Sequence, residues 1–177
     1  MAIRRQLAAW AALAALVAGC QSPPPSQAQG RDVVRPQLGF AIDVPQGWNF
    51  RDLSGYVVLE LYPQAGGVGR SAPVVQVAAI DRQGVDLEAW ADQAIKDSQE
   101  FQADLEVVRR APARLADGRA GLELELKNPR GVRPLIQRML LTVTDHRAYA
   151  VVATVPAAQE SQAETAFKKC FATFVAW

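Results

Sequence analysis

The chain has 177 residues, of which 50% are hydrophobic and 21% are charged, and its formal net charge is +1. Because positive and negative side chains nearly balance, the protein has no overall field that would attract nucleic acid, and nucleic acid is not an expected partner. The length is sufficient for one ordinary domain with its own hydrophobic core.

The first twenty residues have the order of an export signal. Two arginines precede an uncharged apolar run over 7–18, which is shorter than the roughly 20 residues that a transmembrane helix needs. Residues 16–20 (Leu-Val-Ala-Gly-Cys) resemble the lipobox of bacterial lipoproteins, with Val17 in place of the commoner leucine. The resemblance implies a signal peptide over 1–19, cleavage immediately before Cys20, and acyl chains on Cys20 that anchor the protein in a membrane. The alternatives are an ordinary signal peptide with a chance cysteine and a buried apolar helix.

Residues 20–37 are expected to form a flexible, proline-rich linker between this anchor and the domain. The polar segment 21–30 would stay extended and, at about 3.1 Å per residue, would hold the domain about 30 Å from the membrane. By resemblance to the sorting rule of Gram-negative lipoproteins, Gln21 implies the outer membrane, with the domain facing the periplasm. Acylation of Cys20 would leave Cys170 as the remaining thiol, so no internal disulfide is expected.

The pattern after residue 39 predicts strands and then a helix. Segments rich in β-branched and aromatic residues cover 40–44, 56–62 and 73–80, and residues 45–47 (Pro-Gln-Gly) predict a turn before a further strand. The period then changes to that of a helix, for which Asp86 is the expected N-cap. The residues on one face of this helix are Leu87, Trp90, Ala91, Ala94, Ile95 and Ser98.

Strands return after residue 101. One irregular strand is expected over 105–115, where Pro112 cannot donate to a central ladder. Residues 117–118 (Asp-Gly) are the strongest hairpin signal in the chain, because both positions tolerate a positive φ. They lead into an alternating, half-buried strand over 119–127.

The chain ends in two more strands and a second helix. The strands are expected over 135–144 and 149–155, and Pro156 is expected to open the helix. The packing stripe of this helix comprises Ala163, Ala166, Phe167, Cys170, Phe171 and Phe174. The order of elements predicts an α+β domain over 38–177, with a mainly antiparallel, twisted β-sheet flanked by two main α-helices.

Two short motifs resemble the PsbP-like superfamily, which includes the DcrB-type bacterial proteins. Residues 39–48 (Gly-Phe-Ala-Ile-Asp-Val-Pro-Gln-Gly-Trp) resemble the family's first strand and its Pro-x-Gly-Trp turn. Residues 141–149, followed by a terminal Phe-rich helix, are similar to its closing elements. The resemblance covers about 38–177 and implies a PsbP-like sandwich. Family members include photosystem accessory subunits, small-GTPase binders and secretion chaperones, so the resemblance implies binding to other proteins.

Three features that could carry chemistry have a structural interpretation. The Gly-rich segment 66–71 departs from a phosphate-binding loop, because Gln64 occupies the position of the first glycine and a strand follows where a helix is needed. His146 is the single histidine and lies in an expected tight turn. Cys170 lies in an apolar stripe, as inert cysteines do. We therefore predict no catalytic residue, no metal site and no cofactor.

Glu123 and Glu125 share one face of an expected strand, as a pair of catalytic carboxylates would. Alternating charges on the solvent side of a sheet produce the same pattern. Surface pairing with Arg138 on a neighbouring strand is the favoured interpretation.

Lys127, Arg130 and Arg133 cluster around one expected loop and are the leading candidates for a partner-binding surface. Loops carry binding residues more often than sheet faces do. Three further arginines lie upstream: Arg109, Arg110 and Arg114. The alternative is a solvated hairpin tip.

The sequence thus favours a membrane-anchored, non-enzymatic envelope lipoprotein that binds an unidentified envelope protein as an accessory or assembly factor. The alternative is a lipoprotein that binds a small ligand or the cell wall, using a pocket between sheet and helices. A hydrolase is a third hypothesis, which would require a nucleophile, a base and an orienting group in one cleft.

Overall fold

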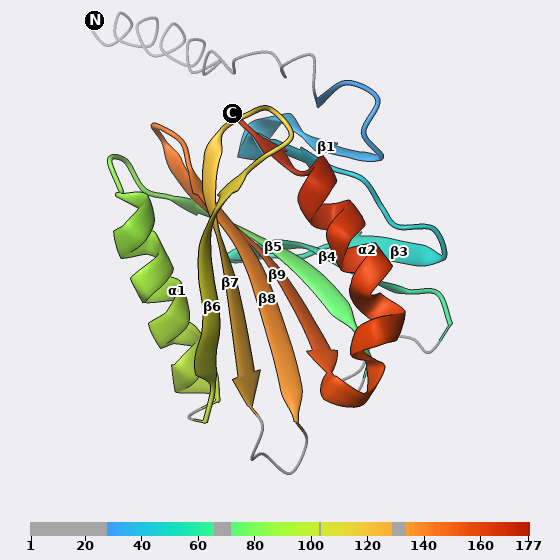
Figure 1. Cartoon of the computed structure of the whole chain (residues 1–177). Helices are drawn as coiled ribbons and strands as arrows, with labels where there is room; N and C mark the ends of the chain where they lie inside the picture. Colours follow the sequence, from blue (N-terminus) through green and yellow to red (C-terminus); the bar gives the residue numbers. More distant parts are fainter. Residues whose placement is uncertain (1–27, 66–71, 103, 129–133) are drawn as a thin grey trace, which may run out of the picture.

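The computed structural model describes residues 28–65, 72–102, 104–128 and 134–177. Within these residues the chain forms one large sheet, one small sheet and two α-helices (Figure 1). The strand order of the large sheet is β3-β4-β5-β9-β8-β7-β6, and all neighbours pair antiparallel. Its strands are β3 (Trp48–Asp52), β4 (Val57–Pro63), β5 (Val74–Asp81), β6 (Glu106–Arg114), β7 (Ala120–Asn128), β8 (Leu135–Val143) and β9 (Arg147–Pro156). The predicted α+β class with a mainly antiparallel sheet is confirmed.

The small sheet has the order β1-β2-β10 and joins both ends of the described chain. Its strands are β1 (Val33–Arg35), β2 (Phe40–Ile42) and β10 (Val175–Ala176). The strand expected over 40–44 corresponds to β2, and all three of its residues are buried. Phe40 and Ile42 pack into the main core, while Ala41 packs on its other side against Ala28.

The folded part of the chain begins earlier than the sequence indicates. The expected linker over 20–37 contains β1, and Ala28 is fully buried against the small sheet. The expected domain boundary at residue 38 is therefore too late, because residues 28–37 already contribute to the fold.

Helix α1 (Leu87–Phe101) covers one face of the large sheet. The predicted N-cap is confirmed, because the Asp86 carboxylate accepts hydrogen bonds from the backbone N–H groups of Glu88 and Ala89, at 2.9 and 3.2 Å. Trp90 is buried against the sheet, and its indole N–H donates to the Tyr149 carbonyl at 2.9 Å. This side chain therefore anchors the helix through both apolar contact and a hydrogen bond.

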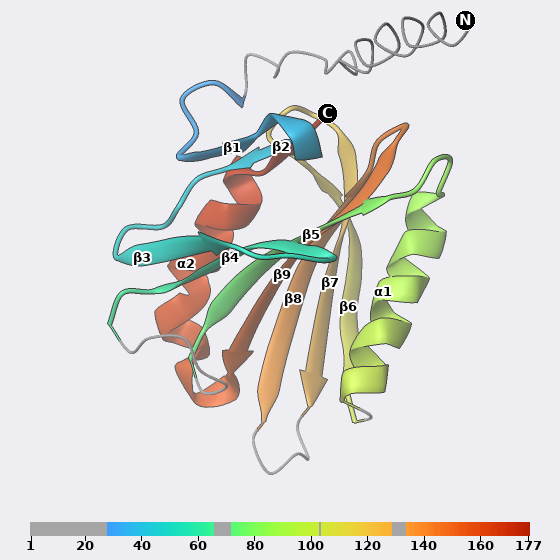
Figure 2. The same cartoon turned by 180° about the vertical axis from the view of Figure 1, so that it is seen from behind.

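Helix α2 (Glu160–Thr173) covers the opposite face, which it shares with the small sheet; Figure 2 shows α1 in front and α2 behind the sheet. Its buried face contains the predicted residues Ala163, Ala166, Phe167 and Cys170. The predicted start at Pro156 is wrong. Pro156 pairs with Leu135 as the last residue of β9, and a short 3₁₀ turn over Ala157–Gln159 precedes the helix.

Strand β7 has the predicted half-buried alternation. Leu122, Leu124 and Leu126 pack toward α1, whereas Glu123 and Glu125 lie on the α2 side of the sheet. The hairpin before β7 is also confirmed, since the N–H of Leu115 donates to the Arg119 carbonyl at 3.0 Å. Gly118 alone has a positive φ there, of 84°. The large sheet ends at β6, so Pro112 lies on an edge strand, as expected.

Candidate functional site

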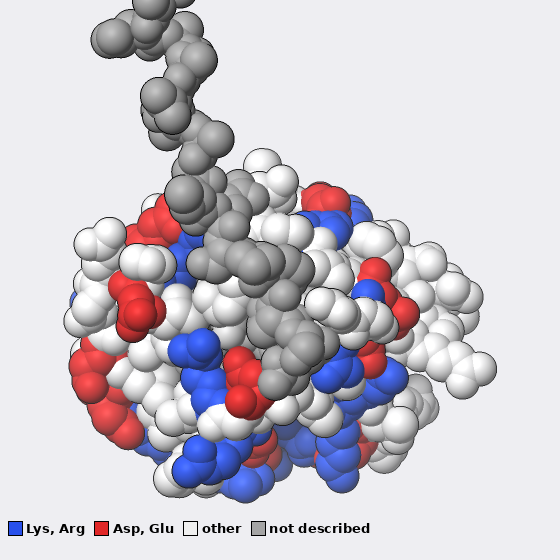
Figure 3. Space-filling view, turned by 90° about the horizontal axis from the view of Figure 1, so that it is seen from above, with Lys and Arg blue, Asp and Glu red and all other residues white. Residues whose placement is uncertain are grey.

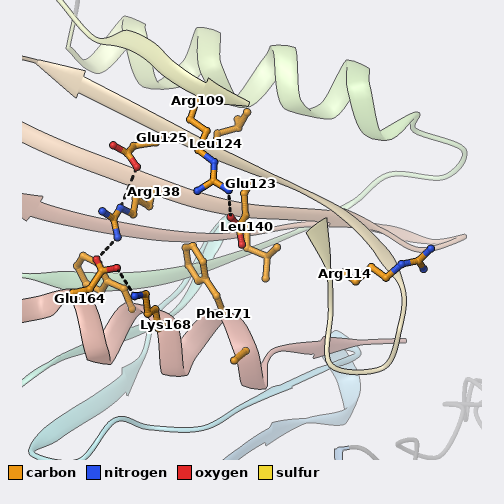
Figure 4. A pocket seen from close by; sticks show the side chains of 12 residues that line it. Arg109, Arg114, Glu123, Leu124, Glu125, Arg138, Leu140, Glu164, Lys168 and Phe171 are labelled. Carbon is orange, nitrogen blue, oxygen red and sulfur yellow. Dashed lines mark hydrogen bonds and ion pairs between the residues drawn. The ribbon is translucent and has the colours of Figure 1, made fainter. Parts of the chain in front are cut away.

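A groove lies between α2 and the β6–β8 part of the large sheet (Figure 4). Helix α2 packs mainly over β9, so within the described part of the chain it leaves the outer strands β6 and β7 uncovered on this face. The groove has a volume of about 500 Å³ and opens to solvent. We call it the α2 groove. Its lining includes Arg109, Arg114, Glu123, Glu125, Arg138, Leu140, Glu164, Phe167, Lys168 and Phe171.

The sheet strands β6, β7 and β8 form the floor of the groove, and their register places charged side chains next to one another. Arg109 of β6 pairs with Glu125 of β7, which pairs in turn with Arg138 of β8. Paired residues of antiparallel strands point to the same face, so three consecutive strands present alternating charges to the groove. Glu123 lies two residues away on the same face, and its carboxylate is 3.7 Å from the Arg109 guanidinium.

Arg138 is the centre of an ion-pair network that joins the sheet to α2. Its guanidinium lies 3.4 Å from the Glu125 carboxylate and 2.6 Å from the Glu160 carboxylate, and it also donates to Glu164. Burial by itself would lower the pKa of Arg138, but these carboxylates raise it above its ordinary value. Lys168 extends the network, with its ammonium 3.0 Å from the Glu164 carboxylate.

Two of the basic side chains, Arg109 and Lys168, lie at the rim of the groove, whereas Arg138, whose side chain is 23% exposed, lies deeper. The side chains of Arg109 and Lys168 are 61% and 73% exposed, whereas those of Glu125 and Glu164 are 18% and 30% exposed. Glu125 is held between Lys127 and Arg138. Glu123 is more exposed, at 39%, and contacts Arg109. A molecule that approaches the groove at Arg109 or Lys168 therefore meets positive charge first.

An apolar patch lies between Arg109 on one rim of the groove and Lys168 on the other. Leu140 of β8 and Phe167 of α2 are buried, and Phe171, one turn further along α2, is half-buried and lines the groove. The groove thus combines exposed cations with an accessible aromatic surface, as binding surfaces for protein segments do.

The interpretation of Glu123 and Glu125 as a charge-pairing face is confirmed. Each carboxylate is paired with a cation, and Arg138 is a partner of Glu125, as predicted. The sequence did not indicate that Glu164 and Lys168 of α2 would face the same strands. The helical spacing of this pair and the alternation of β7 are both visible in the sequence, but their proximity depends on how α2 crosses the sheet.

The basic residues singled out in the sequence do not form one patch within the described part of the chain. Arg130 and Arg133 lie outside the described residues, and Lys127 pairs with Glu125 at 2.9 Å. Arg109 faces the α2 groove, whereas Arg110 bonds to Glu88 and Asp92 on the α1 side. Consecutive residues of a strand point to opposite faces of the sheet, which separates these two arginines.

His146 and Cys170 occupy structural positions, as predicted. His146 is exposed in the tight turn between β8 and β9, where the backbone N–H of Thr144 donates to the Arg147 carbonyl at 2.8 Å and the backbone N–H of Arg147 donates to the Thr144 hydroxyl at 3.1 Å. Cys170 is fully buried, and burial raises the pKa of its thiol to about 12. Cys20 and the Gly-rich segment 66–71 lie outside the described residues.

A second, more open cavity lies beside the Pro-Gln-Gly-Trp turn over residues 45–48. Three aromatic side chains line it, Trp48, Phe50 and Tyr62, together with polar groups from Asn49 and Gln46. Trp48 also packs edge-on against Phe167 at 6.3 Å between ring centroids. The turn thus both fixes α2 and leaves aromatic surface next to polar groups.

Basic and acidic side chains are interleaved over the end of the molecule that is seen from above in Figure 3.

Among the described residues, no group of three or more histidine, cysteine and acidic side chains is arranged to hold a metal ion. In the same part of the chain, no helix is long and apolar enough to cross a membrane.

No family model and no curated protein match this sequence. Solved structures do share its fold. One is the cyanobacterial PsbP (CyanoP) of Synechocystis sp. PCC 6803, with a TM-score of 0.60, 14% identity, and 82% of this chain and 91% of that chain covered. Another is LpqN of Mycobacterium tuberculosis, described as involved in cell envelope biogenesis, with a TM-score of 0.59, 10% identity, and 77% and 82% covered. These similarities confirm the predicted PsbP-like fold.

Proposed function

We propose that this chain is a lipid-anchored envelope protein whose PsbP-like domain binds another protein as a non-enzymatic accessory or assembly factor. The observation that carries the proposal is the α2 groove, an open surface in which exposed cations flank an accessible phenylalanine. Small-molecule pockets are usually enclosed and mainly apolar, whereas seven of the twelve residues that line this groove are charged.

The anchor and the fold support the same proposal. The lipobox-like segment before Cys20 would hold the protein at a membrane, and Gln21 favours the outer membrane, with the domain in the periplasm. LpqN, which shares the fold, is described as involved in cell envelope biogenesis. An accessory role in the envelope is consistent with both.

The test is chemical crosslinking in intact cells with a C-terminally tagged full chain, followed by mass spectrometry. We expect one envelope protein to be enriched, and we expect the enrichment to be lost in a Cys20→Ala variant. Enrichment of no protein over an unrelated tagged lipoprotein would contradict the proposal.

Binding to cell-wall glycan is a second candidate, favoured by the aromatic cavity at Trp48, Phe50 and Tyr62. Aromatic faces beside amide groups suit a sugar ring, which needs both apolar contact and hydrogen bonds. Co-sedimentation of the full chain with purified peptidoglycan tests this candidate. It predicts that Phe50→Ala reduces the sedimented fraction, while Phe171→Ala in the α2 groove leaves it unchanged.

A further inference from the structure

We propose that the α2 groove binds an acidic, extended segment of the partner protein, one that also carries a large apolar side chain. This inference rests on the proposed protein-binding function and adds the site and the chemistry of the bound segment.

The charges favour an anionic partner. Arg109 contacts Glu123 at 3.7 Å, which is longer than a hydrogen bond, so the N–H groups of its exposed guanidinium remain able to donate to an incoming carboxylate. Lys168 has three N–H donors, and its side chain is 73% exposed, against 30% for its ion-pair partner Glu164. Glu125 and Glu164, in contrast, are each already held between two cations.

The apolar patch favours a partner with an apolar side chain between its acidic groups. Phe171 is half-buried between the rim formed by Arg109 and the rim formed by Lys168. A side chain inserted there would cover Phe171 and contact Leu140 and Phe167, which form the base of the patch. Central apolar contacts surrounded by polar groups are the usual arrangement of strong binding positions.

The shape favours a peptide over a membrane surface. The groove is concave, with α2 on one side and the sheet on the other (Figure 4). A flat layer of lipid headgroups would contact the exposed Lys168 and Arg109 before Phe171, which is half-buried between them. An extended peptide fits such a channel, and its side chains alternate between the floor and solvent.

Site-specific photo-crosslinking in intact cells tests the position. A benzoylphenylalanine residue replaces Ala172, an exposed α2 residue that lines the groove, or Ala89, an exposed residue of α1 on the opposite face. We expect an adduct with the envelope partner at position 172 and not at position 89. An adduct at position 89 alone, or equal adducts at both positions, would overturn the groove as the site. If chemical crosslinking still enriches a partner in that case, the proposed function stands and only the site fails.

Fluorescence anisotropy tests the chemistry, with the full chain in detergent and a short labelled peptide of alternating glutamate and leucine. We expect saturable binding that weakens about tenfold in an Arg109→Glu, Lys168→Glu double variant, because reversed rim charges repel the peptide. The control is Lys96→Glu, an exposed lysine of α1, which should leave the affinity unchanged.

Three results would overturn the inference. They are equal binding of a matched lysine–leucine peptide, equal binding by the double variant, and binding of phosphatidylglycerol vesicles through the same two residues when the acidic peptide does not bind. Circular dichroism melts of each variant show whether the fold is intact, so a loss of binding is scored only for folded protein.

Discussion

Cys170 is a free thiol on the buried face of α2. Burial is the main cause of its raised pKa of about 12, and the nearby Asp43 carboxylate adds to it. Because the thiolate is the reactive form, we expect Ellman's reagent to label the native protein at least about a hundredfold more slowly than the urea-unfolded protein.

A Cys20→Ala background makes Cys170 the only thiol in this experiment. The matched control moves the thiol to an exposed position of the same helix, in a Cys170→Ala, Ala172→Cys variant. This thiol should react at nearly the unfolded rate. Fast labelling of native Cys170 would show that its side chain is accessible.

Gly39 has a positive φ of 67° at the point where β2 meets β10. A Cβ at this position would collide with the Trp177 carbonyl oxygen and lie 2.9 Å from the Tyr149 hydroxyl. Gly47 also has a positive φ, of 76°, but a Cβ there would meet nothing within 4 Å.

Comparing alanine substitutions at the two glycines therefore distinguishes the cost of a strained backbone from the cost of a steric collision. We expect Gly47→Ala to lower the free energy of unfolding by about 1 kcal/mol, and Gly39→Ala to lower it by about 3 kcal/mol or more, because backbone must move as well. Urea unfolding followed by circular dichroism measures both. Equal losses would show that the packing of the C-terminus on Gly39 contributes little.

At the scale of elements, Arg138 ties α2 to the sheet through Glu125, Glu160 and Glu164. Replacing it by methionine keeps the apolar stem but leaves three carboxylates close together. We expect Arg138→Met to lower the free energy of unfolding by about 2 kcal/mol, less than for a fully buried pair because the site is partly solvated. Arg109→Met removes only an exposed ion pair and should change the free energy of unfolding by less than about 0.5 kcal/mol. Similar values for both variants in urea unfolding would contradict a special role for Arg138.

The link between α2 and the sheet also predicts a pH dependence. Hydrogen bonds from Lys168 and then Arg138 lower the pKa of Glu164 below its ordinary value of 4.5. A lowered pKa in the folded state stabilises the protein above the unfolded pKa, and this stabilisation is lost as the pH falls through the folded pKa. Between about pH 6 and pH 3, the native chain should therefore lose more stability than Glu164→Gln. Urea midpoints measured at several pH values in this range check the difference; parallel curves for the two proteins would contradict it.

At the scale of the whole molecule, the length of chain between the proposed anchor and the domain limits where the domain can lie. Residue 28 is already packed on the small sheet, and seven residues separate it from Cys20. At about 3.1 Å per residue, this part of the chain spans about 25 Å in an extended state. If Cys20 is acylated, the domain therefore stays close to the membrane surface, with the small sheet at its near end.

Fractionation of cells tests the anchor itself. We expect Cys20→Ala to move the protein from the membrane fraction to the soluble fraction, because several acyl chains are needed for stable anchoring. Cys170→Ala removes the other cysteine and should leave the protein in the membrane fraction. Retention of Cys20→Ala in the membrane would contradict lipidation as the anchor.

The sequence alone determined most elements of this domain. Asp86 as a helix cap, the alternation of β7 and the buried stripe of α2 were predictable, because each depends on residues within a few positions of one another. The same locality explains the assignment of His146 to a turn and Cys170 to the core. The motifs around residues 39–48 further indicated the PsbP-like fold that the solved structures share.

Only the tertiary structure decided which of these elements meet. Residues 28–37 read as a linker because their few apolar side chains have no period, yet Ala28 and Val33 are buried by strands from both ends of the chain. The α2 groove likewise exists because α2 crosses β9 and leaves β6 and β7 open, which brings Arg109 and Lys168 to opposite rims. Contacts between residues so far apart depend on the packing of whole elements, and local sequence patterns do not encode that packing.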